Sequence, residues 1–546
     1  MENKTYVVTA APPNPNGDLH LGHLSGPFLG SDVLSRYLRQ TGHRVHHVSY
    51  ADEHSCYVPR KAAEIGEDPH RTAYRFAQRM ERSLAGGNML PDRFAHPKQD
   101  PRHVEVVHDL FLRLWERGRL EVRTQRVFHC ETCDLNLYEA ELTGLCQECG
   151  STNGGMYCEA CGWPQASDGL AEPRCHFCGE APSIVDEERI VLPVERYRKA
   201  LRNYLDSVDL RPRPRDFIKA LLAEPLEDAA FTRRGTYGVP VPLPGWEGHI
   251  IDTWFAGVCG YLFSLDTLQG GMNSERSGRD IWEDPETAVV HFLGFDCLYS
   301  HAVFWPALCM AEESLVLPEQ IVTNEFYQLE GLKFSTSRGH AIWGSEFFEE
   351  HAADAVRFYL ARTSPETEET SFYRQRFDAA TRELGTYFGD TAELLVGMVR
   401  RSYAGRIPRF DAAAPGKYTA MAQERVDRLA AAFDVRTFSL RSAAEELRSF
   451  AVETYSEVFR IYSLGQETAG GGRRLHDLAE AFLRLVVAAY PIMPTWSESV
   501  LRHFGAEVSW SLDGLRTWPE ASVNLTGDAL VGPELRTPLA RYRGQR

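Results

Sequence analysis

The chain has 546 residues, of which 43% are hydrophobic and 25% are charged, and its formal net charge at pH 7 is −17. These fractions are typical of folded globular proteins and exclude a disordered or fibrous chain, while the length predicts several units instead of one core. The acidic balance argues against a broad basic surface for nucleic acid, although a local groove that binds RNA is compatible with it.

The sequence contains no run of 18 apolar residues, so we expect no transmembrane helix and no membrane partner. The first ten residues lack the apolar segment and the small-residue cleavage site of a signal peptide. We therefore expect a cytoplasmic protein, in which thiols stay reduced and disulfides are disfavoured.

The N-terminal residues predict a βαβ unit. A strand at 6–10 is followed by a loop rich in proline, asparagine and glycine at 11–18, a helix at 22–40 and a second strand at 44–50. In open parallel sheets, ligands bind beyond the carboxyl ends of the strands. The loop and Asp52, which follows the second strand, are therefore candidate ligand-binding positions.

Residues 119–240 interrupt this pattern as an insertion, which holds eight of the twelve cysteines. The α/β pattern resumes as a strand and a helix within 288–310, and a loop with glycine and serine follows at 324–343. From about residue 376 the apolar residues recur at helical spacing. The order of elements thus predicts an α/β fold with an inserted segment and a helical C-terminal part.

Four CxxC pairs within residues 130–178 predict two metal sites. Two thiolates of a tight turn bind one ion, and two such turns complete a tetrahedral four-thiolate zinc site. Such sites have no open coordination position, so we expect two structural Zn²⁺ ions; the spacing alone leaves the pairing open. The other four cysteines are expected to be buried, unreactive thiols. The pairs are Cys130/Cys133, Cys146/Cys149, Cys158/Cys161 and Cys175/Cys178, and the others are Cys56, Cys259, Cys297 and Cys309.

Two short motifs are candidate phosphate-binding elements. His20-Leu21-Gly22-His23 opens the first helix, where backbone N–H groups and the helix dipole favour an anion, and Gly22 leaves room for an adenine ring. The loop from Lys333 to Arg338 carries a cation and hydroxyl groups that suit a pyrophosphate. Either motif alone also fits an ordinary polar surface.

In combination, the two motifs and the cysteine-rich insertion resemble class I aminoacyl-tRNA synthetases, and among them the methionyl-tRNA synthetase family. The resemblance covers nearly the whole chain and includes the four-pair zinc insertion of the archaeal-type subgroup. It implies an α/β fold with a Rossmann-type catalytic domain, a zinc-knuckle connective insert and a C-terminal α-helical bundle. The matching segments are TAAPPNPNGDLHLGH at 9–23, GFDCLYSHAVFWPA at 294–307 and EGLKFSTSRGHAIW at 330–343.

The resemblance also implies the domain boundaries and the zinc pairing. In the family, the two middle cysteine pairs share one zinc ion and the two outer pairs share the other. Carried over, one set is Cys146, Cys149, Cys158 and Cys161, and the other is Cys130, Cys133, Cys175 and Cys178. The implied domains are the first half of the catalytic domain at 1–118, the insert at 119–240, the second half at 241–323, a KMSKS-like loop and stem-contact region at 324–375, and an anticodon-binding-like bundle at 376–546.

Roles for single residues follow from the same resemblance. The substrates implied are ATP, with Mg²⁺, and an amino acid. The residues implied for ATP and catalysis are His20 and His23 at the phosphates, Gly22, Gly294 and Asp296 at the adenosine, and Lys333, Ser335, Thr336 and Ser337 at the pyrophosphate. Those implied for the amino acid are Asp52, which binds the α-ammonium group, with Pro12, Asn14, Trp254, Tyr261 and His301 around the side chain.

The sequence departs from the family at both recognition sites. Pro12-Pro13-Asn14 replaces a Leu-Pro-Tyr-type run, and an acidic residue and an Ala-Pro pair after Trp254 have become Ala256 and Gly257-Val258. Because a hydrophobic pocket discriminates by only about 1–3 kcal/mol per methylene, these changes are large enough to redirect it to another amino acid.

At the anticodon end, Glu393 and Gly397 occupy positions of an anticodon-reading helix, where only Arg401 persists. The family's Pro-Trp pair, which stacks on a base, has no counterpart near 455–466. Stacking and edge hydrogen bonds are how single-stranded RNA is read, so these losses argue against initiator or elongator methionine tRNA as the acceptor.

The leading hypothesis is therefore a methionyl-tRNA-synthetase-like ligase that forms an aminoacyl adenylate and passes the acyl group to a small molecule in a biosynthetic pathway. One alternative is a divergent genuine methionine–tRNA ligase. Another is a non-catalytic, synthetase-like binding subunit, which the joint retention of His20, His23, Lys333 and Asp296 disfavours. The family's short forms also predict a monomer.

Overall fold

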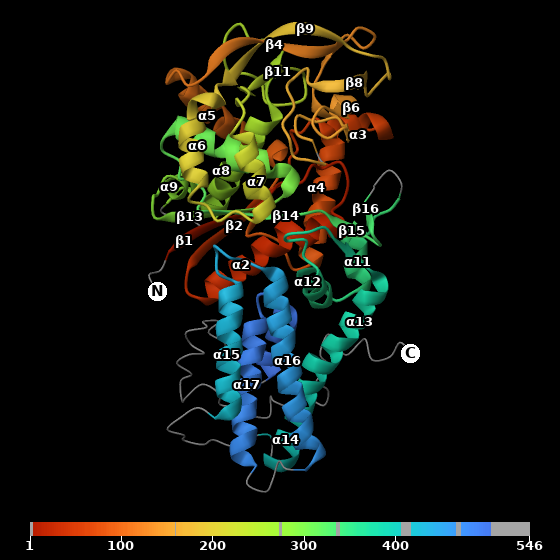
Figure 1. The fold of residues 1–546 in the computed structure, drawn as a ribbon, viewed down its shortest axis with the longest axis vertical. Helices are drawn as coiled ribbons and strands as arrows, with labels where there is room; N and C mark the ends of the chain where they lie inside the picture. The colour runs from red at the N-terminus through yellow and green to blue at the C-terminus, as the bar shows by residue number, and fades with distance from the viewer. Residues whose placement is uncertain are drawn as a thin grey trace.

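A computed structural model describes residues 4–158, 160–271, 276–334, 339–403, 405, 416–465 and 471–503. Figure 1 shows an elongated molecule, with the insert at one end, an α/β region in the middle and a helical bundle at the other end. Within these residues, no helix is both long enough and apolar enough to cross a membrane.

The centre of the α/β region is a parallel sheet with the strand order β14-β13-β1-β2-β3. Consecutive residues of β1 contact different cores: Val7 packs with the helices of the upper half, and Val8 with those of the bundle side. Both faces are therefore buried, as expected for a parallel sheet. The strands are β1 (Thr5–Ala10), β2 (Arg44–Tyr50), β3 (Arg93–Ala95), β13 (Thr287–Gly294) and β14 (Gln320–Asn324).

The predicted first helix is one helical run with an irregular start. It comprises α1 (Leu21–His23), a wider π-type turn η1 (Leu24–Phe28) and α2 (Leu29–Gln40). Pro27 lies inside the turn and has no N–H to donate, which accounts for the local change of helix type. The chain leaves the helix at Gly42, which has a positive φ, and the helix ends at residue 40 as predicted.

Helices on the upper side of the sheet form its second core layer, in which α8 packs against α5 and against β2. The predicted strand and helix within 288–310 are confirmed as β13 and α10. The helices of the α/β region are α3 (Tyr57–Ile65), α4 (Pro69–Gly86), α5 (Arg102–Glu116), α8 (Thr253–Gly271), α9 (Gly278–Trp282) and α10 (Trp305–Glu312).

The insert consists of antiparallel sheets. The long strands β4 (Glu121–Cys130) and β9 (Ser183–Leu192) pair antiparallel, and a smaller sheet has the order β7-β6-β8. The other elements here are β5 (Leu135–Leu137), η3 (Glu139–Glu141), β6 (Leu142–Cys146), β7 (Thr152–Asn153), β8 (Leu170–Cys175), α6 (Arg198–Leu205), α7 (Pro212–Leu221), β10 (Ala229–Ala230), β11 (Thr232–Arg234) and β12 (His249–Ile251).

The C-terminal part is helical, as predicted. The fully buried Arg357 of α12 forms an ion pair of 2.6 Å with Asp32 of α2 and donates to carbonyl oxygens of Pro491 and Ile492. This contact fixes the bundle against the helix that follows the histidine motif. The helices are α11 (Gly344–Glu350), α12 (Ala353–Arg362), α13 (Arg374–Leu384), α14 (Thr391–Tyr403), α15 (Lys417–Ala432), α16 (Leu440–Ser463), α17 (Gly472–Ala489) and α18 (Pro494–His503).

Candidate nucleotide and amino-acid site

His20 and His23 form a reciprocal cap at the start of α1. The Nδ1 atom of His20 accepts from the N–H of Gly22 at 3.1 Å, and the Nδ1 atom of His23 accepts from the N–H of His20 at 3.2 Å. Loss of solvent around the rings lowers the pKa of His20 well below its usual value and that of His23 to about 4. Both imidazoles are therefore neutral near pH 7, with Nε2–H as the free donor of each ring.

The second motif packs directly on this cap. The ring of Phe334 stacks on His20 with the centroids 4.4 Å apart, and the N–H of Leu21 donates to the carbonyl of Ile342 at 3.1 Å. Gly22 is required here, because a Cβ at this position would lie 2.9 Å from the His20 ring and 3.2 Å from Phe334. Two motifs separated by about 310 residues in the sequence thus form one surface.

Only part of the predicted pyrophosphate loop is described. Lys333 lies in β16 (Leu332–Lys333), which pairs with β15 (Tyr327–Leu329), and its exposed ammonium group is 5.2 Å from the ring centroid of Phe326. The next residue in the chain, Phe334, is the one whose ring stacks on His20. Ser335, Thr336 and Ser337 lie outside the described residues.

Gly294 and Asp296 lie at the carboxyl end of β13, beside the loop that follows β1. Backbone pairing fixes this arrangement, because the N–H of Ala11 donates to the carbonyl of Phe292 at 2.8 Å. A Cβ on Gly294 would approach the Asp296 carboxylate to 2.5 Å, so only glycine leaves that carboxylate its present position. Both residues lie at the sheet edge where α/β folds bind nucleotides.

Asp52 presents a carboxylate without a partner. Its backbone N–H donates to the carbonyl of Pro13 at 3.0 Å, yet no hydrogen bond or ion pair reaches its side chain from the described residues. Burial, together with the nearby carboxylates of Glu139 and Glu53, raises the pKa of Asp52 to about 8. A cation bound here would reverse that shift, which makes Asp52 a suitable site for an ammonium group. Pro12 and Asn14 lie on either side of Pro13 and are partly exposed.

The predicted pocket residues Tyr261 and His301 contact each other. The Tyr261 hydroxyl and His301 Nε2 are 2.9 Å apart, and His301 Nδ1 is 3.1 Å from the carbonyl of Cys297. Burial lowers the pKa of His301 to about 4, so the ring is neutral and suits an uncharged ligand. Tyr50 packs edge-on against Tyr261 and connects this pair to β2, whose end carries Asp52.

Two residues of this region carry no motif signal in the sequence. His291 of β13 lies 5.3 Å from the His301 ring and shares a 2.6 Å hydrogen bond with the hydroxyl of Thr9. Glu139 of the insert accepts a hydrogen bond from the indole N–H of Trp254. Because Glu139 lies 115 residues from Trp254 in the sequence, only the tertiary fold reveals that the two are in contact.

The eight knuckle cysteines gather into the two sets that the resemblance implied. Within each set the four sulfurs lie within 4.8 Å of one another, and two sulfur pairs in each set are 3.4–3.9 Å apart. A tetrahedral zinc site with Zn–S bonds of about 2.3 Å needs sulfurs about 3.8 Å apart, so both sets fit Zn²⁺. Of the other cysteines, Cys56, Cys259 and Cys309 are buried and Cys297 is partly exposed.

The sequence of the cysteine turns explains their shape without reference to a metal ion. Gly150, Gly162 and Gly179 follow the second cysteine of three pairs, and each has a positive φ. The N–H of each glycine donates to the carbonyl of the first cysteine of its pair at 2.7–2.9 Å. Glycine adopts this conformation without strain, so the CxxCG pattern closes the turn and directs both thiols to one side.

Comparison with known proteins agrees with this geometry. Residues 6–393 match the family described as tRNA synthetases class I (M). The methionine–tRNA ligase of Thermomicrobium roseum is 30% identical over 92% of this chain and 87% of its own length. That of Methanopyrus kandleri is 29% identical over 97% of this chain and 79% of its own length.

A solved structure supports the fold. Mycobacterium tuberculosis methionyl-tRNA synthetase bound by methionyl-adenylate superposes with a TM-score of 0.75 and 20% sequence identity, over 97% of this chain and 99% of the other. The enzymes of this class are ligases that form an aminoacyl adenylate. From the family match, the relatives and the joined motifs, we conclude that the chain belongs to the class I aminoacyl-tRNA synthetases, in the methionyl, or (M), family.

Proposed function

We propose that this protein is an ATP-dependent methionine–tRNA ligase, which activates methionine as methionyl-AMP and transfers it to tRNA. The observation that carries the proposal is the Asp52 carboxylate, which no side chain of the described residues pairs with and which follows the strand of Tyr50, beside the aromatic residues of the predicted pocket. The relatives that align over nearly the whole chain are methionine–tRNA ligases.

In the first step, ATP binds along the carboxyl edge of the sheet. The Nε2–H groups of His20 and His23 donate to phosphate oxygens, and Lys333 neutralises the pyrophosphate, to which Mg²⁺ bound with ATP would add further positive charge. Gly294 and Asp296 bind the ribose. A carboxylate oxygen of the amino acid attacks the α-phosphorus and forms a new P–O bond, while the bond from that phosphorus to the β-phosphate oxygen breaks and pyrophosphate leaves.

The amino acid is oriented by its ammonium group on Asp52, which lies at the end of β2. Its side chain enters the region of Trp254, Tyr261 and His301, where the neutral His301 and the aromatic rings accept an uncharged group. In the second step, a hydroxyl of the acceptor attacks the acyl carbonyl and AMP leaves. Positioning and electrostatics suffice for both steps, without a covalent enzyme intermediate.

The acceptor is where this proposal differs from the hypothesis favoured by the sequence. That hypothesis named a small molecule because stacking residues were missing from the expected positions, but the comparisons give it no support. The relatives align through the helical bundle as well as the catalytic domain, which favours tRNA. A methionine–tRNA ligase is therefore the better interpretation, and a non-catalytic subunit does not fit a family of ligases.

The surface of the bundle supports an RNA ligand. Phe459 and Tyr462 lie about one turn apart on α16 and are 48% and 40% exposed. The guanidinium of Arg401 on α14 lies 5.2 Å from the Tyr462 ring, and Tyr455 stacks near Phe459. Aromatic rings beside an arginine suit the stacking of unpaired bases, even without the family's Pro-Trp pair.

Removal of these rings separates the two acceptors. In a Phe459→Ala/Tyr462→Ala variant we expect tRNA charging to fall by about 10- to 100-fold, since base stacking contributes ~1–3 kcal/mol per base. Amino-acid-dependent ATP–pyrophosphate exchange without tRNA should stay at the wild-type rate. Leu464→Ala, at an exposed apolar position close by, is the matched control. Charging that is absent in the wild type, or unchanged in the variant, would favour a small-molecule acceptor.

A further inference from the structure

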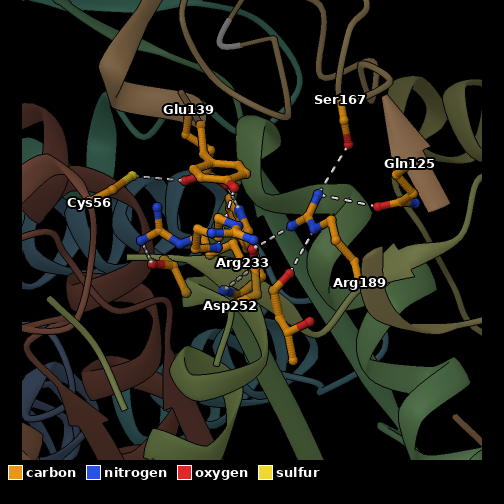
Figure 2. Close-up of polar contacts among 12 residues, drawn as sticks. Cys56, Gln125, Glu139, Ser167, Arg189, Arg233 and Asp252 are labelled. Atoms are coloured by element: carbon orange, nitrogen blue, oxygen red, sulfur yellow. Dashed lines mark hydrogen bonds and ion pairs between the residues drawn. The ribbon is translucent and has the colours of Figure 1, made fainter. Parts of the chain in front are cut away.

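The start of α8 is held by the insert. Asp252, Thr253 and Trp254 open this helix, which also carries Gly257 and Tyr261 of the pocket. Each of the three receives one charged side chain from the other side: Arg189 of β9 contacts Asp252 at 3.4 Å, Arg233 of β11 donates to Thr253 at 3.3 Å, and Glu139 accepts from Trp254 (Figure 2).

Glu139 is the member of this group that reaches both sides of the amino-acid site. One carboxylate oxygen accepts the indole N–H of Trp254, and the other lies 3.2 Å from the thiol of Cys56 (Figure 2). Cys56 is four residues after Asp52, at the start of α3. A single side chain of the insert therefore contacts the segment that follows the ammonium-binding carboxylate and the helix that carries the aromatic residues.

The backbone at Glu139 is unusual for a residue with a side chain. Its φ is +46°, in the left-handed region that residues other than glycine, asparagine and aspartate rarely adopt. The adjacent turn is closed by Glu141, whose carboxylate accepts the N–H of Tyr138 at 2.9 Å. Arg60 of α3 also donates to the carbonyl of Ala140 at 3.4 Å. The surroundings thus hold a strained residue with its carboxylate directed at Trp254.

Charge connects Glu139 with Asp52 as well. The Glu139 carboxylate is the largest electrostatic contributor, after burial itself, to the raised pKa of Asp52. Burial and Asp252 raise the pKa of Glu139 to about 7, and the guanidinium of Arg233 opposes this shift. Together, Glu139 and Asp52 make the region strongly favourable for a bound ammonium group.

We propose that Glu139 is a positioning residue for amino-acid binding, through which the zinc-knuckle insert fixes the indole of Trp254 and strengthens the ammonium site at Asp52. This inference rests on the proposed function, since it takes the pocket at Asp52 and Trp254 as the amino-acid site. It assigns the insert a role in substrate affinity that its four-thiolate metal sites do not explain by themselves.

The test is amino-acid-dependent ATP–pyrophosphate exchange with methionine, measured for full-length variants. Glu139→Ala should raise the KM for methionine about tenfold, the loss expected for a hydrogen bond to a charged group, while the KM for ATP stays within about twofold. Glu139→Gln keeps an acceptor for the indole N–H but lacks the charge, so it should recover the part of that loss that comes from the hydrogen bond and not the whole of it. Glu188→Ala, at an exposed position of β9 in the same insert, should behave as the wild type.

A double-mutant cycle separates positioning from a general loss of structure. Trp254→Phe removes the indole donor, so Glu139→Ala/Trp254→Phe should raise the KM little more than the larger single change does. Three results would overturn the inference. The effects of Glu139→Ala and Trp254→Phe on the KM for methionine could multiply in the double variant, or the KM for ATP could rise as much as that for methionine. Alternatively, Glu139→Ala and Glu139→Gln could both lose zinc and have a lower melting temperature. A wild-type protein that shows no methionine-dependent exchange would overturn the proposed function, and this inference with it.

Discussion

The nucleotide half and the amino-acid half of the site are built in different ways. The nucleotide half consists of backbone turns and neutral rings: His20 and His23 cap one helix, and Phe334 stacks on them. The amino-acid half consists of carboxylates and an aromatic ring from distant segments, with Asp52 after β2, Trp254 from α8 and Glu139 from the insert. Neutral hydrogen-bond donors at the start of a helix bind any phosphate group, whereas charged and aromatic side chains in defined positions give specificity for one ligand.

The largest expected effect is on the amino-acid half of the site. Asp52→Asn keeps the size of the side chain but removes the charge, so kcat/KM for the amino acid should fall by about 10³-fold, in line with the ~2–5 kcal/mol cost of breaking a buried charge pair. The KM for ATP should change little. Pyrophosphate exchange at varied amino acid and ATP checks both values. Asp206→Asn, at an exposed position of the chain, is the control, and an unaffected Asp52→Asn enzyme would remove Asp52 from the site.

A change in the nucleotide half should lower kcat and leave the KM for the amino acid unchanged. His20→Ala removes one phosphate donor and the ring on which Phe334 stacks, so kcat should fall by about 10²-fold, as for other lost transition-state donors. The KM for the amino acid should remain near the wild-type value. Single-turnover formation of the adenylate measures the chemical step directly. If the amino-acid KM rose as steeply as kcat fell, the two halves would not be separable.

Removal of one zinc ion tests whether the insert affects the amino-acid half of the site and leaves the nucleotide half unchanged. We expect about two Zn²⁺ per chain in the wild type and about one in Cys158→Ser, because each four-thiolate set binds one ion. The KM for the amino acid should rise by about 10-fold or more, as when the support of a metal site is removed, and that for ATP should not. Metal analysis and exchange kinetics on the same sample check this. Zinc-free wild-type protein with full activity would contradict it.

The pH dependence tests the same carboxylate by titration instead of substitution. Below its raised pKa of about 8, Asp52 is protonated in the free enzyme and cannot pair with an ammonium group, so amino-acid kcat/KM should rise about tenfold per pH unit from 6 towards 8. His23, with a pKa of about 4, is already neutral over this range, so the KM for ATP should stay flat. Asp52→Asn should abolish the slope, and a flat profile in the wild type would refute the assignment.

The same contrast explains what the sequence could predict. The histidine cap and the cysteine turns are local patterns, in which spacing alone brings the groups together, so His20, His23 and the knuckle turns could be recognised along the chain. The grouping of the cysteines came from a family resemblance, and the stacking of Phe334 on His20 was not predicted from the sequence. Neither Glu139 nor His291 lies in a recognisable pattern, because each reaches the pocket through tertiary packing.

Two differences from the sequence-based expectations have physical causes. The first helix widens at Leu24–Phe28 because Pro27 removes a backbone donor within it. The missing Pro-Trp pair suggested a bundle without base-stacking groups, yet Phe459 and Tyr462 expose aromatic rings on α16. The absence of the family's Pro-Trp pair from the sequence gave no information about these rings, since their exposure depends on how α14 and α16 pack.

The measurement that tests the central claim most directly is ATP–pyrophosphate exchange across a panel of amino acids, followed by charging of tRNA with the best substrate. The account predicts that methionine drives exchange and that tRNA is charged with it. Exchange driven by a different amino acid, or methionine exchange without any tRNA charging, would contradict the account and show that the altered pocket or the bundle serves another substrate.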